Sequence, residues 1–320
     1  RGSIRAHSGG SVVLIAPSVE NSGLIHADGE VLLAGGHSVT LLDLNNPTVG
    51  LTVSAKEGES AVNLGDVIGK NVSFFSSLVK NSGVVEATNV SLGKGGVIKF
   101  SGKQVEVLAG SRIQADGQNG GGTVHIGGGW QGKDASMQNA MSTRVEADAT
   151  ISANALGHGD GGEVAIWSDG TTRVDSAIQA KGGELSGNGG RVETSGKQRL
   201  SVSVAANTSA PNGKAGQWLL DPYNLRVVQA GSVLLDPDKA VVNIGNVPDA
   251  TYVPIDQNPE GPDSFLSNAV LRDAFNSNSS VVLKTTGGTG GSGLGNISIE
   301  APVILGSQGA CGSFGATASL

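Results

Sequence analysis

Apolar and polar residues alternate with a period of two over short runs along most of the chain. Clear examples are residues 97–101 (VIKFS), 163–167 (EVAIW) and 200–204 (LSVSV). These runs end at sequences such as 115–117 (ADG) and 168–170 (SDG), where Gly, Asp and Ser favour tight turns. Because successive side chains of a strand point to opposite faces, the alternation predicts short strands with one buried face.

The strand pattern repeats behind pairs of glycines. A Gly-Gly pair followed by an alternating run begins at Gly9, Gly95, Gly121, Gly161 and Gly189. The last four starts, at 95, 121, 161 and 189, differ by 26, 40 and 28. A period of about 20–30 residues indicates a solenoid. The sequence therefore predicts an all-β fold, a right-handed parallel β-helix with three strands per coil, and about 13 coils at roughly 22–25 residues each.

Two segments interrupt the repeat. The long interval between Gly121 and Gly161 predicts an inserted loop at 127–143. Residues 264–275 (SFLSNAVLRDAF) carry apolar side chains at helical spacing and predict a short amphipathic helix, with Asp263 or Ser264 as its N-cap. The proline-containing stretch 246–262 before it is expected to be irregular.

The chain divides into three regions by these features. Residues 1–90 are expected to form the first coils. Residues 91–227 continue the Gly-rich β-helix with the inserted loop at 127–143. Residues 228–320 form a region of extra coils with the irregular loop, the helix and the final strands.

Composition supports a thin repetitive β structure. Glycine accounts for 51 of 320 residues and aromatic residues for only 3%, while hydrophobic residues still reach 38%, too many for a disordered chain. The net charge of −7 and the absence of a basic cluster argue against a nucleic-acid partner. Cys311 is the single cysteine, so no disulfide framework is possible. No apolar run is long enough for membrane insertion or for a signal peptide, so if the protein is secreted, its signal lies upstream.

No catalytic or metal-binding constellation emerges from the spacing. The acidic residues of the central repeats fall on different turns and outward positions, which predicts solvated surface rather than a catalytic groove: Asp160, Glu163, Asp169, Asp175 and Glu184. The histidines are widely spaced and form no metal-ligand motif: His7, His26, His37, His125 and His158. We therefore expect no enzymatic activity, no metal and no cofactor.

A few residues are candidates for binding or modification. Trp130 lies in the predicted loop and is the best candidate for a ligand contact, whereas Trp167 is predicted to point outward and Trp218 to pack at the end of a coil. Five asparagines in N-x-S/T triplets are candidate glycosylation sites: Asn71, Asn89, Asn207, Asn278 and Asn296.

Several stretches resemble the two-partner secretion exoproteins, the family of filamentous hemagglutinin and the high-molecular-weight adhesins. Residues 21–44 are similar to the family's N-x-G-x-I-x-A-x-G coils, and the most specific matches are SGK at 195–197 and WLLDPYN at 218–224. The resemblance identifies the chain as a segment downstream of the secretion domain, and it implies that residues 1–90 lie at the end of that domain or just after it. It implies export through an outer-membrane transporter barrel that recognises the upstream region, and a place outside the cell, secreted or on the bacterial surface.

Three functions remain open at this stage. The first is a structural and adhesive segment of a surface exoprotein, used in cell adhesion, biofilm or host attachment. The second is a module that captures a host protein, such as a haem carrier, or a host glycan or matrix polysaccharide; large insertions forming a binding face would favour it. The third is a polysaccharide-cleaving β-helix enzyme, which requires acids from neighbouring coils to line one groove.

Overall fold

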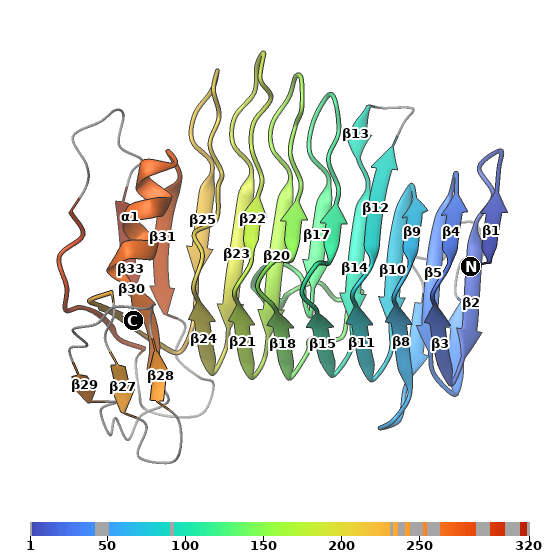
Figure 1. The fold of residues 1–320 in the computed structure, drawn as a ribbon, viewed down its shortest axis with the longest axis horizontal. Helices are drawn as coiled ribbons and strands as arrows, with labels where there is room; N and C mark the ends of the chain where they lie inside the picture. The colour runs from blue at the N-terminus through green and yellow to red at the C-terminus, as the bar shows by residue number, and fades with distance from the viewer. Residues whose placement is uncertain are drawn as a thin grey trace.

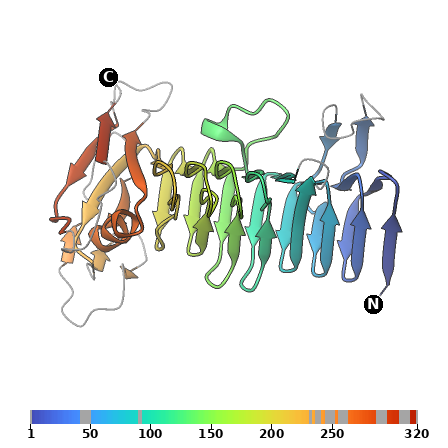
Figure 2. The same ribbon diagram turned by 90° about the horizontal axis from the view of Figure 1, so that it is seen from above.

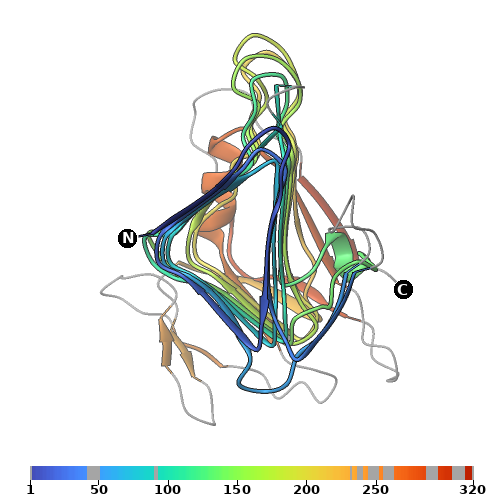
Figure 3. The same cartoon turned by 90° about the vertical axis from the view of Figure 1, so that its right-hand side faces the viewer.

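The chain folds into a right-handed parallel β-helix, as the sequence predicts (Figure 1). The computed structural model describes residues 2–41, 51–89, 93–230, 233–235, 241–243, 252–254, 263–285, 295–304 and 314–318. Seen along the rod, the coils superimpose as a three-sided cross-section (Figure 3). Each side of this cross-section is one parallel sheet, and the chain visits sheets A, B and C in turn.

The three sheets run the length of the rod. The main path of sheet A has β1 (Ser3–Ala6), β4 (Leu24–Ala27), β9 (Asp66–Gly69), β12 (Val84–Asn89), β16 (Arg112–Gln114), β19 (Thr150–Ser152) and β22 (Ala177–Gln179). Sheet B has β2 (Val12–Ala16), β5 (Glu30–Gly35), β10 (Asn71–Phe75), β14 (Val97–Ser101), β17 (Thr123–Ile126), β20 (Glu163–Ser168), β23 (Arg191–Gly196), β25 (Gln217–Leu220), β31 (Ser280–Thr285) and β33 (Phe314–Ala318). Sheet C has β3 (Ser18–Asn21), β8 (Ser60–Asn63), β11 (Leu78–Asn81), β15 (Gln104–Val107), β18 (Ser142–Val145), β21 (Thr171–Val174), β24 (Arg199–Val202), β30 (Asp263–Ser267), β26 (Asn224–Val228) and β32 (Ile297–Ile299).

Smaller elements branch from the coils. The antiparallel pair β6 (Ser38–Leu41) and β7 (Leu51–Ser54) lies between β5 and β8 in the chain, and β13 (Lys94–Gly95) pairs with β12. A three-stranded sheet contains β27 (Val233–Leu235), β28 (Val241–Asn243) and β29 (Tyr252–Pro254). The described helices are the 3₁₀ turn η2 (Trp130–Gly132) and α1 (Asn268–Asn276). Neither described helix is long and apolar enough to cross a lipid bilayer.

The register of sheet B follows the glycine repeat. Val97 pairs with Thr123, Thr123 with Glu163, and Glu163 with Arg191. The differences in residue number between successive partners equal the intervals between the Gly-Gly pairs. The residue after each pair therefore lies in one row on the outer face of sheet B, and the next residue points into the core.

The core is a stack of aliphatic and aromatic side chains from all three sheets. In sheet B, one inward column contains Val72, Ile98, Val124, Val164, Val192, Trp218 and Val281, all with no exposed surface. In the neighbouring column the rings of Phe74 and Phe100 are parallel, with centroids 4.6 Å apart. A buried aliphatic or aromatic side chain contributes about 1.5–3 kcal/mol. One coil cannot offset its ordering entropy with so few contacts, so each coil depends on its neighbours.

The corner between sheets C and A contains a ladder of buried asparagines. The amide Nδ2 of Asn21 donates to Oδ1 of Asn63, and Nδ2 of Asn63 donates to Oδ1 of Asn81, both at 2.8 Å. The same side chains bond the backbone of the following turns, for example Asn63 Nδ2 to the Gly65 carbonyl at 3.0 Å. The ladder satisfies buried polar groups where the chain turns inside the first coils.

The glycine pairs mark the corner where the chain enters sheet B. A Cβ on Gly122, Gly162, Gly190 or Gly216 would collide with the carbonyl oxygen of the equivalent glycine one coil earlier, beginning at Gly96. The backbones of consecutive coils touch here without room for a side chain. Longer Gly-rich loops extend beyond this corner in the central coils (Figures 1 and 3).

The C-terminal region departs from the predicted layout in two ways. The helix α1 begins at Asn268 with Ser267 as N-cap, because the residues before it, predicted to start the helix, instead form the sheet C strand β30. Ser267 accepts a hydrogen bond from the Ala269 amide at 3.2 Å. The prediction of Asp263 or Ser264 as N-cap is wrong, since both lie within the strand. The predicted irregular stretch 246–262 falls outside the described residues except for Tyr252–Pro254.

The order of strands in sheet C also changes near this end. Strand β30 lies between β24 and β26, although β26 precedes β30 in the chain. In earlier coils, a sheet A strand connects a sheet C strand to the next sheet B strand. Here helix α1 takes that place and connects β30 to β31. The prediction of about 13 coils is too high: the longest described sheets have ten strands, because the excursions take residues out of the coils.

Candidate functional site

The most elaborate surface of the described chain is the outer face of sheet B beneath the excursion between β17 and β18. This excursion occupies residues 127–141 and contains η2. It stands out from the otherwise regular coils (Figure 2). The backbone amide of Gln131 donates a 2.6 Å hydrogen bond to Oε2 of Glu193 on β23, so the excursion is fastened to a coil two strands beyond its own. We call residues 127–141 the clasp loop.

The clasp loop covers Trp167. This side chain points outward from β20, as the alternation predicts, yet only 7% of it is exposed. Gly128 and Gly132 lie against the indole, and a Cβ at either position would be 2.7 Å from an atom of Trp167. The loop therefore needs glycine at these positions to cover the ring, and Trp167 is unavailable as a ligand contact.

A charged network joins the loop to sheet B. Lys99 Nζ lies 2.9 Å from Asp134 Oδ2, and His125 Nε2 lies 2.7 Å from Glu163 Oε1. His125 Nδ1 lies 3.4 Å from Asp134 Oδ2, within range of an ion pair but without hydrogen-bond geometry. Glu163 also pairs with Arg191. The network involves four consecutive strands of sheet B, β14, β17, β20 and β23, and joins them to the loop.

The carboxylates of this network are held ionised. Burial acts to raise the pKa of Asp134, but hydrogen bonds from Ser136 and Lys99 outweigh it and hold the pKa below the ordinary aspartate value. Burial likewise acts to raise the pKa of Glu163, and the hydrogen bond from His125 with the charge of Arg191 reverses the shift. Both groups therefore remain negative near neutral pH and attract the cations beside them.

Trp130, the predicted ligand contact, stands at the edge of this network. The guanidinium carbon of Arg191 lies 4.5 Å from the centroid of its ring, a cation–π contact. The side chain of Trp130 is half-buried, in contrast to the buried Trp167 and Trp218. Its indole N–H makes no hydrogen bond within the described part of the chain.

Glu193 is the most unusual group beneath the loop. Its side chain has no exposed surface, and its Oε1 has no hydrogen-bond partner among the described residues. Burial raises the pKa of Glu193 to about 7, against the opposing hydrogen bond from Gln131. Asp221 and Lys284, which form a 3.0 Å ion pair, are the nearest charges on the following coils.

A Glu193→Gln variant is expected to remove a pH-dependent loss of stability. The folded pKa of about 7 lies above the ordinary value of 4.5. The buried carboxyl is therefore tolerated below about pH 4.5 and becomes progressively unfavourable as the pH rises through 7. At pH 8.5 the variant should exceed the wild type by on the order of 3 kcal/mol, and the two should converge near pH 4.5.

Urea unfolding of both proteins at several pH values measures this difference. The matched control is Glu184→Gln, an exposed glutamate in a Gly-rich loop, which should leave the pH profile unchanged. Equal profiles for wild type and Glu193→Gln would show that Glu193 is not buried in solution.

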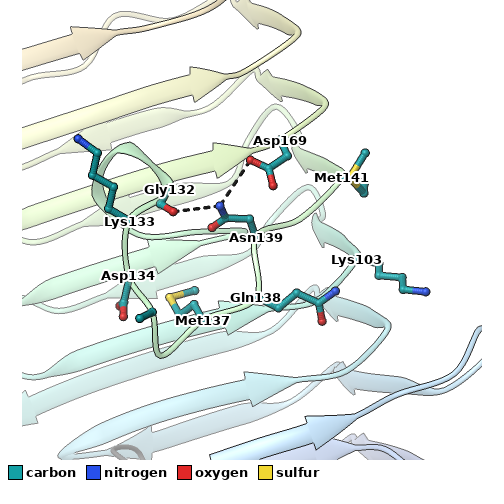
Figure 4. A pocket seen from close by; sticks show the side chains of 10 residues that line it. Lys103, Gly132, Lys133, Asp134, Met137, Gln138, Asn139, Met141 and Asp169 are labelled. Atoms are coloured by element: carbon teal, nitrogen blue, oxygen red, sulfur yellow. Dashed lines mark hydrogen bonds between the residues drawn. The ribbon is translucent and has the colours of Figure 1, made fainter. Parts of the chain in front are cut away.

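Two hollows flank the clasp loop. An open pocket of about 520 Å³ lies beside the loop (Figure 4), and Lys103, Asp134, Met137 and Asp169 are among its lining residues. In it, Asn139 Nδ2 donates to the Gly132 carbonyl at 3.0 Å and approaches Asp169 at 3.5 Å, so it joins the two arms of the loop to the turn after β20.

The second hollow is a groove of about 710 Å³ across the outer face of sheet B. Its lining contains the glycine pairs at 121–122, 161–162 and 189–190, the equivalent Ala215-Gly216, Asp160, and the outward row of Thr123, Glu163, Arg191, Gln217 and Ser280. This groove crosses several coils and runs with the rod rather than along a strand. We call it the glycine groove.

The structure brings only some of the predicted acids together. Asp160 and Glu163 both line the glycine groove, whereas Asp169 lies at the other hollow. Asp175 pairs with Arg173 on sheet C, and Glu184 is exposed in a Gly-rich loop. Within the described ranges, no three His, Cys, Asp or Glu side chains gather as metal ligands would.

The candidate glycosylation sites lie in different surroundings. Both amide atoms of Asn71 are engaged, with Glu30 Oε1 at 2.6 Å and the Val97 amide at 2.9 Å. Asn89, Asn207 and Asn278 are half-buried, and Asn296 is exposed. Modification of these residues stays a prediction, with Asn296 the most accessible.

Comparison with known proteins gives a likeness to a solved structure. No protein-family model matches the chain, and no curated protein matches it. Among solved structures, the chain is similar to the HMW1 secretion domain from Haemophilus influenzae, with 28% identity and a TM-score of 0.53. The match covers 69% of this chain and 65% of that structure, so the chain spans less than two thirds of it. The likeness agrees loosely with the predicted family, but it falls on a secretion domain rather than on a segment downstream of one.

Proposed function

We propose that the chain is a structural and adhesive segment of a secreted bacterial exoprotein of the two-partner secretion type, displayed on the cell surface. The observation that supports this most is the stack of coils built from three parallel sheets, together with its likeness to the HMW1 secretion domain. Each coil contacts mainly its neighbours, so length can be added without a new core. Such a rod suits a protein that holds a binding surface away from the cell.

The composition fits a chain that folds after export. The chain has one cysteine in 320 residues, and the fold needs no disulfide to close a coil. Backbone pairing between consecutive coils lets the chain add one coil at a time. We propose the partner as an outer-membrane transporter barrel that recognises the upstream region. Our placement of the chain just downstream of the secretion domain stays a prediction, and the likeness to a secretion domain favours an overlap with that domain.

Secretion of the complete exoprotein tests this proposal. In bacteria that express it with its transporter barrel, an antibody against this chain should detect it outside the cell in folded, protease-resistant form. Without the barrel the protein should remain inside. Export that does not depend on the barrel would contradict the two-partner assignment.

Adhesion is tested separately on the same cells. Displayed exoprotein should increase attachment to host cells or to a biofilm, and the purified chain added in solution should compete for the same surface and reduce that attachment. Unchanged attachment would leave the chain without the adhesive role that we propose. Failure here would not affect the outcome of the secretion measurement.

A second candidate is a binding module for a glycan or a host protein. The clasp loop and the glycine groove support it, because they give sheet B a shaped and charged outer surface. The enzyme hypothesis has less support: of the acids that line the groove, Glu163 already pairs with His125 and Arg191. We continue to expect no catalytic activity.

A further inference from the structure

We propose that the glycine groove binds a neutral, extended β-linked glycan that lies along the rod. The site rests on the proposed function, since it requires the rod to be exposed outside the cell. The groove is about 710 Å³ and crosses the coils that contain the glycine pairs from Gly121 to Gly216.

The floor of the groove is flat because of how the coils pack. Side chains are absent where Gly162, Gly190 and Gly216 contact the preceding coil. The backbone amides of these glycines donate inside the protein, for example Gly162 to the Ala153 carbonyl and Gly190 to the Ala180 carbonyl, both at 2.7 Å. The backbone amides of the floor are therefore already paired, and the floor is rigid. It lets a ligand approach closely but offers it no free amide donors.

Hydrogen bonds to the ligand would come from side chains at the border of the glycine groove. Arg191 is held from two sides, by Glu163 and by the ring of Trp130, yet 55% of its side chain is exposed. Gln217 is exposed one strand further on, and its side-chain amide has no partner among the described residues. Both groups are planar and suit vicinal hydroxyls, which donate and accept hydrogen bonds, and Arg191 is in addition held in place before binding.

The spacing favours an extended glycan. Neighbouring strands of a sheet lie about 4.8 Å apart, similar to the rise of one sugar unit in an extended β-1,4-linked chain. Arg191 and Gln217 occupy adjacent strands at the same register. They can therefore contact hydroxyls of successive sugar units, which present alternate edges to the same side of such a chain.

The charges favour a neutral ligand. The charged residues that line the groove are Asp160, Glu163 and Arg191. Glu163 already balances Arg191, and the exposed Asp160 adds a negative charge. An acidic polysaccharide would be repelled here, and a phosphate-rich ligand would lack cations. The few apolar side chains in the lining argue against an apolar peptide.

Titration of the folded chain with cellohexaose, a neutral β-1,4-glucan, tests the site by calorimetry and by tryptophan fluorescence. Trp130 should report binding, because it contacts Arg191 while Trp167 and Trp218 are buried. Arg191→Ala and Gln217→Ala should each weaken binding at least tenfold. Thermal unfolding midpoints near that of the wild type would show that both variants fold, and if one does not, the other carries the test.

The matched control is Arg173→Ala on sheet C. Arg173 also pairs with an acid, Asp175, and its side chain is 58% exposed, close to the 55% of Arg191. This variant should bind like the wild type. Absence of cellohexaose binding by the wild type, or equal binding by Arg191→Ala, would overturn the proposal.

Two further measurements separate the alternatives. A hexamer of β-1,4-linked glucuronate, an acidic chain of the same linkage and length, should bind more weakly than cellohexaose; tighter binding would overturn the assignment to neutral glycans. Arg191→Ala introduced into the complete exoprotein should still be exported through the transporter barrel. Failure of glycan binding with normal export would reject the site and leave the proposed secretion intact.

Discussion

A Gly162→Ala variant is expected to be destabilised by about 3 kcal/mol or more. The new methyl group would overlap the Gly122 carbonyl oxygen, which accepts the Glu163 amide at 2.9 Å. Relief of the overlap requires two coils to separate at the corner where their backbones touch. Because Gly190 lies in the same way against Gly162, the disturbance should extend to the next coil. Urea unfolding followed by circular dichroism measures the loss.

The control for this change is Gly157→Ala in the Gly-rich loop of the same coil. There the added methyl would lie 3.2 Å from the Gln118 carbonyl, a tight contact that a small shift relieves. A cost below about 1 kcal/mol is expected. Similar unfolding midpoints for Gly162→Ala and the wild type would contradict the close packing of coils described at the glycine pairs.

A Trp218→Ala variant is expected to cost about 3–5 kcal/mol. Trp218 has no exposed surface and fills the inward column of sheet B between Val192 and Val281. Its indole Nε1 donates a 3.0 Å hydrogen bond to Oγ1 of Thr194, which is itself buried. The variant would leave a cavity and remove the indole partner of that hydroxyl. Limited proteolysis and urea unfolding should show loss of the coils around β25 first.

Trp130→Ala provides the comparison, since it removes the same side chain from a half-buried position on the clasp loop. Its effect on unfolding should be about 1 kcal/mol or less. A Trp218→Phe variant should retain most of the stability because the ring still fills the column. Equal costs for the alanine variants of Trp130 and Trp218 would mean that Trp218 is not part of the core.

The regular part of the rod could be predicted from the sequence because its causes are local. The alternation of apolar and polar residues shows which face of each strand is buried. The glycine pairs mark the corner where the backbones of consecutive coils touch. The distance between pairs therefore equals the pairing register of sheet B. The position of β30 could not be predicted in this way. Its sequence, DSFLS, and that of β26, NLRVV, fit sheet C in either order, and only packing of the whole C-terminal region decides between them.

The candidate site could be predicted in part. Glu163 and Arg191 each follow a glycine pair, so alignment of the repeats places opposite charges on adjacent strands. The cover over Trp167 and the burial of Glu193 had no comparable signal, because both depend on how the clasp loop folds across two strands. The half-buried position of Trp130 suits a ligand contact, which stays a prediction, and its contact with Arg191 required the three-dimensional arrangement.

The position of β30 imposes an order of assembly on a chain that emerges from its N-terminus. Pairing of Val174 with Val202 joins consecutive coils, whereas Val202 meets Leu266 only after the whole stretch 203–265 is available. Closing the longer loop costs more chain entropy. Coils up to β24 can therefore form one after another as the chain emerges, whereas β26 gains its neighbour β30 only later. This part of the rod would then grow by steady addition of coils up to β24, followed by one late closure that brings β25, β26, β30, α1 and β31 together.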